Sequence, residues 1–315
     1  MAVTLTEAAK LSQTQLQRGV IETFIQESPI LDRIPLMDIE GNAFGYNEEA
    51  TLPGVAFRSV NEAYTESTGT FNQKTESLVI LGGDADVDRF IVRTRGNLND
   101  QRAAQTRMKV KAAAYKYQDT FFNGDVSVDA KAFDGLKKRL TGAQVIDTAT
   151  NGMGPVAGGH DFFDVLDAGI AAVPGINASN GAIYANAGVI ARIKSSARRL
   201  GGVEMVREAL TQKMVATYNG IPLLDPGSTA AGVSILPQTE TQGSATGTSA
   251  SIYIVKFGQD EGDQAVTGLT NGGVQAYDLG ELQEKPAYRT RVEFYCGMAV
   301  FGGKAAARIR GVLNA

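Results

Sequence analysis

Residues 51–71 read TLPGVAFRSVNEAYTESTGTF and lie inside a longer stretch, 39–81, in which apolar and polar residues alternate at several points. This alternation is typical of β-strands with one covered face. We expect two long strands joined by the polar segment NEAYTESTGT. Two strands alone bury too little apolar surface to be stable in water. The apolar residues of this hairpin are therefore predicted to pack on another chain: Val55, Phe57, Val60, Tyr64 and Phe71.

Downstream of the hairpin, residues 99–123 form the clearest helical segment of the sequence. The segment is rich in Ala, Gln, Lys and Arg and contains no Gly or Pro, and Gly124 can end the helix. At the rise of an α-helix it would be about 35 Å long. Its apolar residues fall on two stripes, one with Ala104, Met108, Ala112, Tyr115 and Phe122, the other with Ala103, Val110, Ala114, Tyr117 and Phe121. This pattern predicts a helix between two layers.

Between those stripes, the basic residues Arg102, Lys109 and Lys116 recur every seven residues. They are candidates for contact with DNA phosphates or with the carboxylates of a neighbouring chain. The alternative is an ordinary solvated helix face.

The second half of the chain has the pattern of a mixed α+β lobe. We expect a surface loop at 237–251, where Thr, Gln, Gly and Ser dominate, and a turn at Asn219-Gly220. The expected helices are 161–173, 187–200 and 203–210, and the expected strands are 182–184, 215–218, 252–257, 274–279 and 291–301, before a final run at 305–312. Near the N-terminus, 5–25 has mixed helical spacing and is interpreted as an arm that needs a partner surface.

Composition excludes several classes of function. The formal net charge of −4 lacks the basic excess of a protein that grips nucleic acid over its whole surface. The single cysteine, Cys296, excludes an intrachain disulfide and a thiolate zinc cluster, and its apolar surroundings predict a buried thiol. No secretory signal or membrane-spanning segment is recognisable, so no membrane contact is expected.

Searches for catalytic and metal motifs also fail, and neither an enzyme nor a cofactor is expected. The only histidine, His160, stands at a predicted helix start, where it or Asp161 would cap backbone amides. Asp84, Asp86 and Asp88 resemble the start of a calcium loop, but Arg89 occupies the required glycine position, so we expect one solvated acidic face. The segment GMAVFGGKAA lacks the lysine and hydroxyl positions of a phosphate-binding loop and is interpreted as a glycine-bent strand.

The order of these elements resembles the tailed-bacteriophage major capsid protein family, which has the Hong Kong 97-like fold. Four segments carry the resemblance: the hairpin sequence TLPGVAFRSVNEAYTESTGTF, the segment LVILGGDADVDRFI after it, and the motifs FFNGD and FDGL. The resemblance implies an N-terminal arm at 1–38, an extended E-loop at 39–81, a P-domain at 82–181 with its spine helix at about 99–123, an A-domain at 182–286, and C-terminal strands at 287–315 that return to the P-domain.

The same resemblance implies a structural role in the virion, with assembly in the host cytoplasm into pentamers and hexamers around double-stranded DNA, and with scaffolding, portal and decoration proteins as candidate partners. Some members of the family cross-link subunits through a lysine, and Lys74 lies where such a lysine would sit, but no matching asparagine or acid is found. Two alternatives stay open: an encapsulin shell that encloses protein cargo, and a soluble α+β hydrolase acting through carboxylates such as Asp84 or Asp161.

Overall fold

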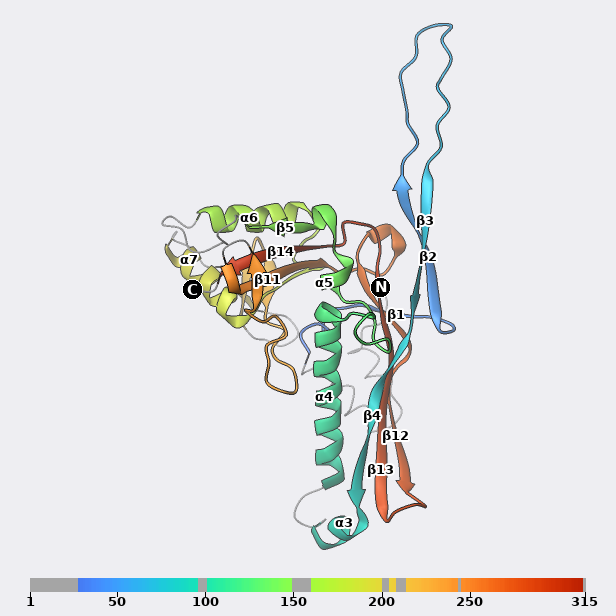
Figure 1. The fold of residues 1–315 in the computed structure, drawn as a ribbon, viewed down its shortest axis with the longest axis vertical. Coiled ribbons are helices and arrows are strands. Elements are labelled where there is room, and N and C mark those ends of the chain that lie inside the picture. Colours follow the sequence, from blue (N-terminus) through green and yellow to red (C-terminus); the bar gives the residue numbers. More distant parts are fainter. Residues whose placement is uncertain are drawn as a thin grey trace.

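The computed structural model describes residues 28–95, 101–148, 160–199, 204–207, 214–242 and 245–313. Two lobes and a projecting hairpin make up the described chain (Figure 1). One lobe combines a long sheet with the helix α4, and the other is a mixed lobe beside it. The predicted α+β class is confirmed.

The first lobe is a four-stranded sheet covered on one face by a long helix, α4 (Gln101–Asn123). Its strands, in sheet order, are β1 (Leu36–Asp38), β12 (Val266–Glu281), β13 (Ala287–Val300) and β4 (Val79–Asp88), followed along the chain by the short helix α3 (Arg89–Arg95). Along β13, Val292, Phe294 and Cys296 are buried, whereas the residues between them are only half-buried. Alternate residues of a strand point to opposite faces, so this pattern gives the sheet one core face.

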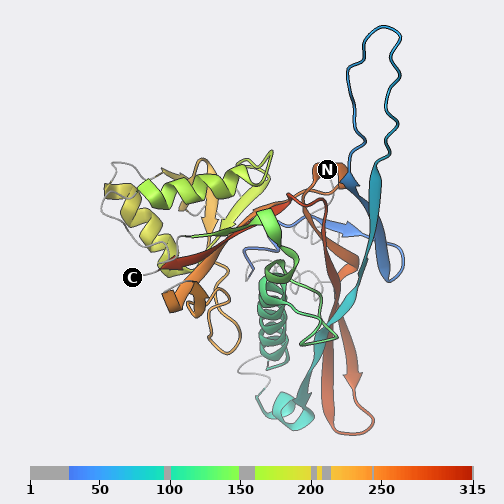
Figure 2. The ribbon, with the colours of Figure 1, turned by 45° about the horizontal axis from the view of Figure 1, so that its top comes forward.

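The second lobe is built on an eight-stranded sheet. Its path runs β5 (Val145–Asp147), β14 (Ala306–Leu313), β11 (Ala245–Lys256), β6 (Gly181–Tyr184), β9 (Ile221–Leu224), β8 (Met214–Tyr218) and β7 (Glu204–Arg207), with β10 (Glu240–Gln242) paired to β11. The helices α6 (His160–Ala171) and α7 (Ala187–Arg199) belong to this lobe, and α5 (Leu136–Arg139) lies at the junction with α4 (Figure 2). The described chain also has two 3-10 turns, η1 (Gly142–Gln144) and η2 (Glu261–Asp263).

One hydrophobic cluster joins the two lobes. It contains Tyr117 and Phe122 of α4, Phe294 of the long sheet, and Tyr184 and Tyr253 of the second sheet. The segment before β1 enters the same cluster, with Ile30, Leu31 and Ile34 each no more than 1% exposed. A single helical turn, in which the Ile34 amide donates to the Ile30 carbonyl, places these side chains together. The first described residues, 28–34, therefore pack between the two lobes, and we call this segment the plug.

The hairpin consists of β2 (Ala43–Thr51) and β3 (Thr70–Ser77), paired antiparallel with Tyr46 opposite Lys74. Residues 52–69 between the strands have no regular structure, apart from a turn around Asn61, whose φ is +67°. The Leu78 amide donates to the Asn42 carbonyl, and β4 starts one residue later, so β3 and β4 run on almost as one strand. The two predicted hairpin strands are confirmed.

Several sequence expectations need correction. The segment 203–210, expected to be helical, contains the strand β7, which pairs with β8. The expected loop at 237–251 includes β10 and the start of β11. The segment GMAVFGGKAA is not one bent strand, because β13 ends at Val300 and β14 begins at Ala306. In the first two cases pairing with the next strand of the chain outweighs the local pattern. The arm at 5–25 lies outside the described residues.

The two sheets also divide the chain differently from the expected domain bounds. β12 falls inside the expected A-domain, 182–286, but pairs with β13 in the long sheet. β14 falls inside the C-terminal segment expected to return to the P-domain, but pairs with β11 and β5 in the second sheet. The chain therefore crosses between the lobes twice after β11.

Candidate intersubunit surface

The hairpin carries the largest group of exposed apolar residues in the described chain. All five residues predicted to contact a neighbour are exposed, each by at least 67%, and Leu52, which the sequence argument did not single out, is 78% exposed. The two strands diverge into an open loop that projects away from both lobes (Figure 1). Isolated exposed apolar residues are common on proteins, but a contiguous group marks an interaction site.

Only one face at the base of the hairpin lies on the body. Along β2, Tyr46 is buried and Phe44 and Glu48 are half-buried, while Gly45 and Asn47 between them are exposed. The Tyr46 hydroxyl donates to the Val300 carbonyl at 3.1 Å, and its ring meets that of Phe301 edge-on, with centroids 5.0 Å apart. Burial, and next the negative charge of Glu76, raise the pKa of Tyr46 to about 12. The tyrosine therefore stays neutral and hydrogen-bonded at physiological pH.

The second attachment of the base is an ion pair. Arg139, at the end of α5, donates from both terminal nitrogens to the two carboxylate oxygens of Glu76 on β3, with Nη2 and Oε2 2.6 Å apart. Arg139 Nε donates to the Asp134 carbonyl at 2.6 Å. The two side chains are only 17% and 16% exposed. Bidentate pairing of this kind has defined geometry as well as charge.

The predicted basic stripe on α4 does not form one free surface. Arg102 bridges Asp278 of β12, with 2.6 Å between Nη2 and Oδ1, and its guanidinium stacks on the Tyr288 ring. Lys109 is half-buried, and its stem lies against Gly83 of β4, where an added Cβ would come within 3.1 Å of Lys109 Cδ. Only Lys116 is exposed. Arg102 and Lys109 therefore stabilise the contact between the helix and the sheet.

The two apolar stripes of α4 also differ. Val110, Ala114, Tyr117 and Phe121 of one stripe are buried against the sheet and α5. In the other stripe Ala104 is exposed and Met108 is 63% exposed. Phe122 of the same stripe is buried, so within a single chain this second flank is covered only near the C-terminal end of the helix.

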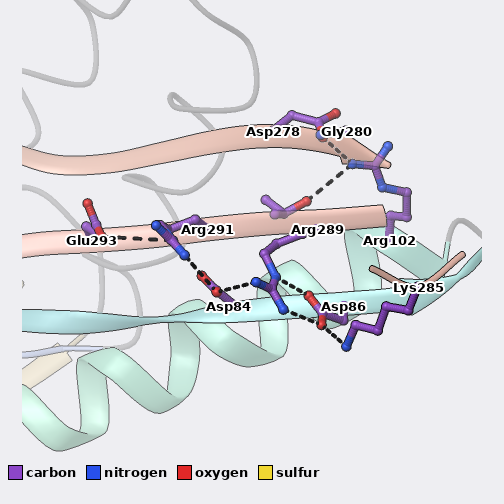
Figure 3. Close-up of polar contacts among 10 residues, drawn as sticks. Asp84, Asp86, Arg102, Asp278, Gly280, Lys285, Arg289, Arg291 and Glu293 are labelled. Carbon is purple, nitrogen blue, oxygen red and sulfur yellow. Dashed lines mark hydrogen bonds and ion pairs between the residues drawn. The ribbon is translucent and has the colours of Figure 1, made fainter. Parts of the chain in front are cut away.

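The acidic residues of β4 are not a free solvated face. Asp84 and Asp86 face Arg291 and Arg289 of β13 across the sheet, and Lys285 also bonds Asp86 (Figure 3). Hydrogen bonds from these basic groups, most of all from the arginines, hold the pKa of both carboxyls below its usual value. Asp88 is exposed, and its carboxylate accepts from the Phe90 amide at the start of α3. Asp84, named as a candidate catalytic carboxylate, is thus occupied by ion pairs.

The remaining candidates for chemistry are few. Cys296 is buried, as predicted, and burial raises the pKa of its thiol to about 12. α6 begins at His160, but the side chains of His160 and Asp161 lie outside the described ones. Among the described residues, no group of three His, Cys, Asp or Glu side chains could hold a metal ion. No helix in this part of the chain is long and apolar enough to cross a membrane.

We compared the chain with protein families, curated proteins and solved structures. The family model described as Major capsid protein GP7 matches residues 12–156. No curated protein matches the chain at the level of sequence.

Among solved structures, the chain is similar to the holo-SrpI encapsulin complex from Synechococcus elongatus, with a TM-score of 0.66 and 18% identity over 100% of this chain and 97% of that one. The capsid of a native GTA particle matches with a TM-score of 0.63 and 14% identity, covering 91% of this chain and 90% of that one. A structure described as Microbacterium phage Oxtober96 matches with a TM-score of 0.57 and 12% identity, covering 90% of each chain.

The likeness to the encapsulin extends over the whole chain, and the other two cover 91% and 90% of it. The fold is the Hong Kong 97-like fold that the resemblance implied. The family match over residues 12–156 agrees with the resemblance to the tailed-phage major capsid protein family.

Proposed function

We infer that this chain is the major capsid protein of a tailed phage, a structural protein that self-assembles into the head shell around double-stranded DNA. The observation that carries this function is the projecting hairpin, whose apolar residues have no cover within the chain. A shell subunit must bury surface on several neighbours, and a hairpin that cannot be stable alone gains that burial on a second copy.

The proposal includes closed assembly in pentamers and hexamers, in the virion, after assembly in the host cytoplasm. Val55, Phe57, Val60, Tyr64 and Phe71 form the contact, together with Leu52. Scaffolding, portal and decoration proteins remain candidate partners. For the enclosed DNA, Lys116 is the exposed member of the basic stripe and is the one that we retain.

We also propose a domain division that follows the sheets. The arm, the E-loop hairpin and the spine helix α4 keep the roles that the resemblance implies. The P-domain sheet takes β1, β4, β12 and β13, and the A-domain takes the second sheet, including β14. The continuous part of the A-domain then ends before Val266 rather than at residue 286, and β14 joins the same domain later in the chain.

The test is deletion of residues 61–71 and, separately, replacement of Val55, Phe57 and Val60 by serine. Both variants should remain soluble and folded, because these residues contribute nothing to the core of the single chain. Neither should form shells in electron micrographs. Normal shells from the serine variant would contradict the role of the hairpin, and a native chain that forms no particles under any condition would contradict the proposed function.

An encapsulin shell is the second candidate, and the similarity to an encapsulin over the whole chain favours it. The two functions differ in what purified particles contain. Nuclease-protected DNA inside the particles supports the capsid, and an enclosed protein without nucleic acid supports the encapsulin.

A further inference from the structure

Apart from the near-continuous run of β3 into β4, few side chains join the hairpin to the body. On β3, Glu76 is half-buried and the rest of the strand is exposed. On β2, contact with the body is limited to the face that carries Phe44, Tyr46 and Glu48. The pairing register places Phe44 opposite Glu76, so the aromatic contact and the ion pair act on the two strands at the same level of the hairpin.

The aromatic contact constrains one strand of the hairpin, β2. Phe44 and Tyr46 meet the ring of Phe301 edge-on, with centroids 6.3 and 5.0 Å away. Edge-to-face contacts have a preferred geometry, and the Tyr46 hydroxyl adds one hydrogen bond to the Val300 carbonyl. The Arg139–Glu76 pair also depends on angle, because two parallel N–H···O bonds form only when guanidinium and carboxylate are coplanar.

Arg139 is itself held in place by the body. Its Nε donates to the Asp134 carbonyl, and its helix α5 follows directly from Gly135, whose amide donates to the Gly124 carbonyl at the end of α4. These hydrogen bonds fix the position of the guanidinium relative to the long helix α4. We propose that Arg139 and Glu76 are a positioning pair that sets the angle between the hairpin and the helix α4. If the chain has the proposed function, this angle directs the contact residues toward the neighbouring subunit.

Small angular errors at the base become large at the tip. At the rise of an extended strand, the fourteen or so residues from Glu76 to the tip span about 45 Å, so a tilt of about 10° moves the tip by about 8 Å. A shift of that size would separate the apolar residues of the tip from any site shaped to receive them.

The experiment measures the angle directly. Spin labels on T65C at the hairpin and A191C on α7 report one distance in the unassembled subunit, because the native Cys296 is buried. R139Q and E76Q should shift or widen the distance distribution and reduce the yield of closed shells. The double variant E76R/R139E should restore both. Circular dichroism identifies any variant that is not folded, and either single variant is sufficient for the distance measurement.

Lys74→Gln is the matched control, since it removes an ion pair with Glu48 on the paired strand and leaves Arg139 and Glu76 unchanged. Its distance distribution should equal that of the native chain. Unchanged distributions in folded R139Q and E76Q would overturn the proposal. If the native chain forms no shells, the proposed function fails while the distances still test the positioning pair.

Discussion

Arg291 on β13 and Asp84 on β4 occupy paired positions of the antiparallel ladder, and two nitrogens of Arg291 donate to both carboxylate oxygens of Asp84 at 2.7 and 3.0 Å. Arg289 and Asp86 repeat the arrangement two residues along, at 2.7 and 2.8 Å (Figure 3). The face of β4 and β13 opposite α4 is thus joined by a row of ion pairs. Cross-strand pairs of opposite charge stabilise a sheet where no second layer covers it.

The acidic members of this row should make stability depend on pH. The native pKa of Asp86 lies below the unfolded value of about 3.9, so its contribution is complete above that pH and is lost as the pH falls through the native pKa. Asp86→Asn should lower the urea midpoint of the unassembled subunit at pH 7 and lower it less at pH 3. Glu261→Gln, on an exposed turn, is the control. An equal lowering of the urea midpoint at pH 7 and pH 3 would contradict the stabilising role of the ionised Asp86.

The plug before β1 should be a large contributor to stability. Leu31 is 1% exposed and lies in the cluster that joins the two lobes. Leu31→Ala removes buried methyl groups and leaves a cavity, which should cost about 2–5 kcal/mol of unfolding free energy. Leu52→Ala, at a residue that is 78% exposed on the hairpin, should leave the free energy of unfolding of the single subunit unchanged. Denaturant unfolding of both variants measures the difference, and similar values would show that the plug is dispensable.

Gly135 should not tolerate a side chain. A Cβ there would lie 2.6 Å from the Thr120 carbonyl oxygen and 2.7 Å from the Gly124 nitrogen, and both atoms belong to the backbone. Gly135→Ala should therefore separate α5 from the end of α4 and lower the melting temperature. Gly262→Ala is a good control, because nothing lies within 4 Å of its Cβ and its φ is not positive. Equal melting temperatures would mean that the α4–α5 junction adjusts freely.

Two basic residues of α4 should have different roles, Arg102 in stability and Lys116 at the exposed surface. Arg102→Ala loses the Asp278 bridge and the stacking on Tyr288, and should lower stability by about 1 kcal/mol. Lys116→Ala should leave the melting temperature unchanged, and any effect should be confined to DNA retention in particles. Thermal unfolding and the nucleic-acid content of purified particles are the two measurements. A stability loss in Lys116→Ala would contradict its assignment to the exposed surface.

Local sequence was enough to predict the long helix, since 99–123 matches α4 within two residues. Strong helix formers and a following glycine act over a few residues, so no distant contact was needed. How far each flank of that helix is covered could not be predicted. Met108 and Val110 are both apolar, and only the position of the sheet leaves the first exposed and the second buried.

Sequence by itself determined the hairpin, the spine helix, the buried cysteine and the absence of a recognisable catalytic motif, because alternation, propensity and residue type are local properties. Tertiary structure alone decided which strands share a sheet, as with β12 beside β13, and which charges meet. Arg139 and Glu76 are 63 residues apart in the chain, and neither neighbourhood indicates the other. Their contact exists because the fold brings the base of β3 beside the end of α5, a relation that no local pattern encodes.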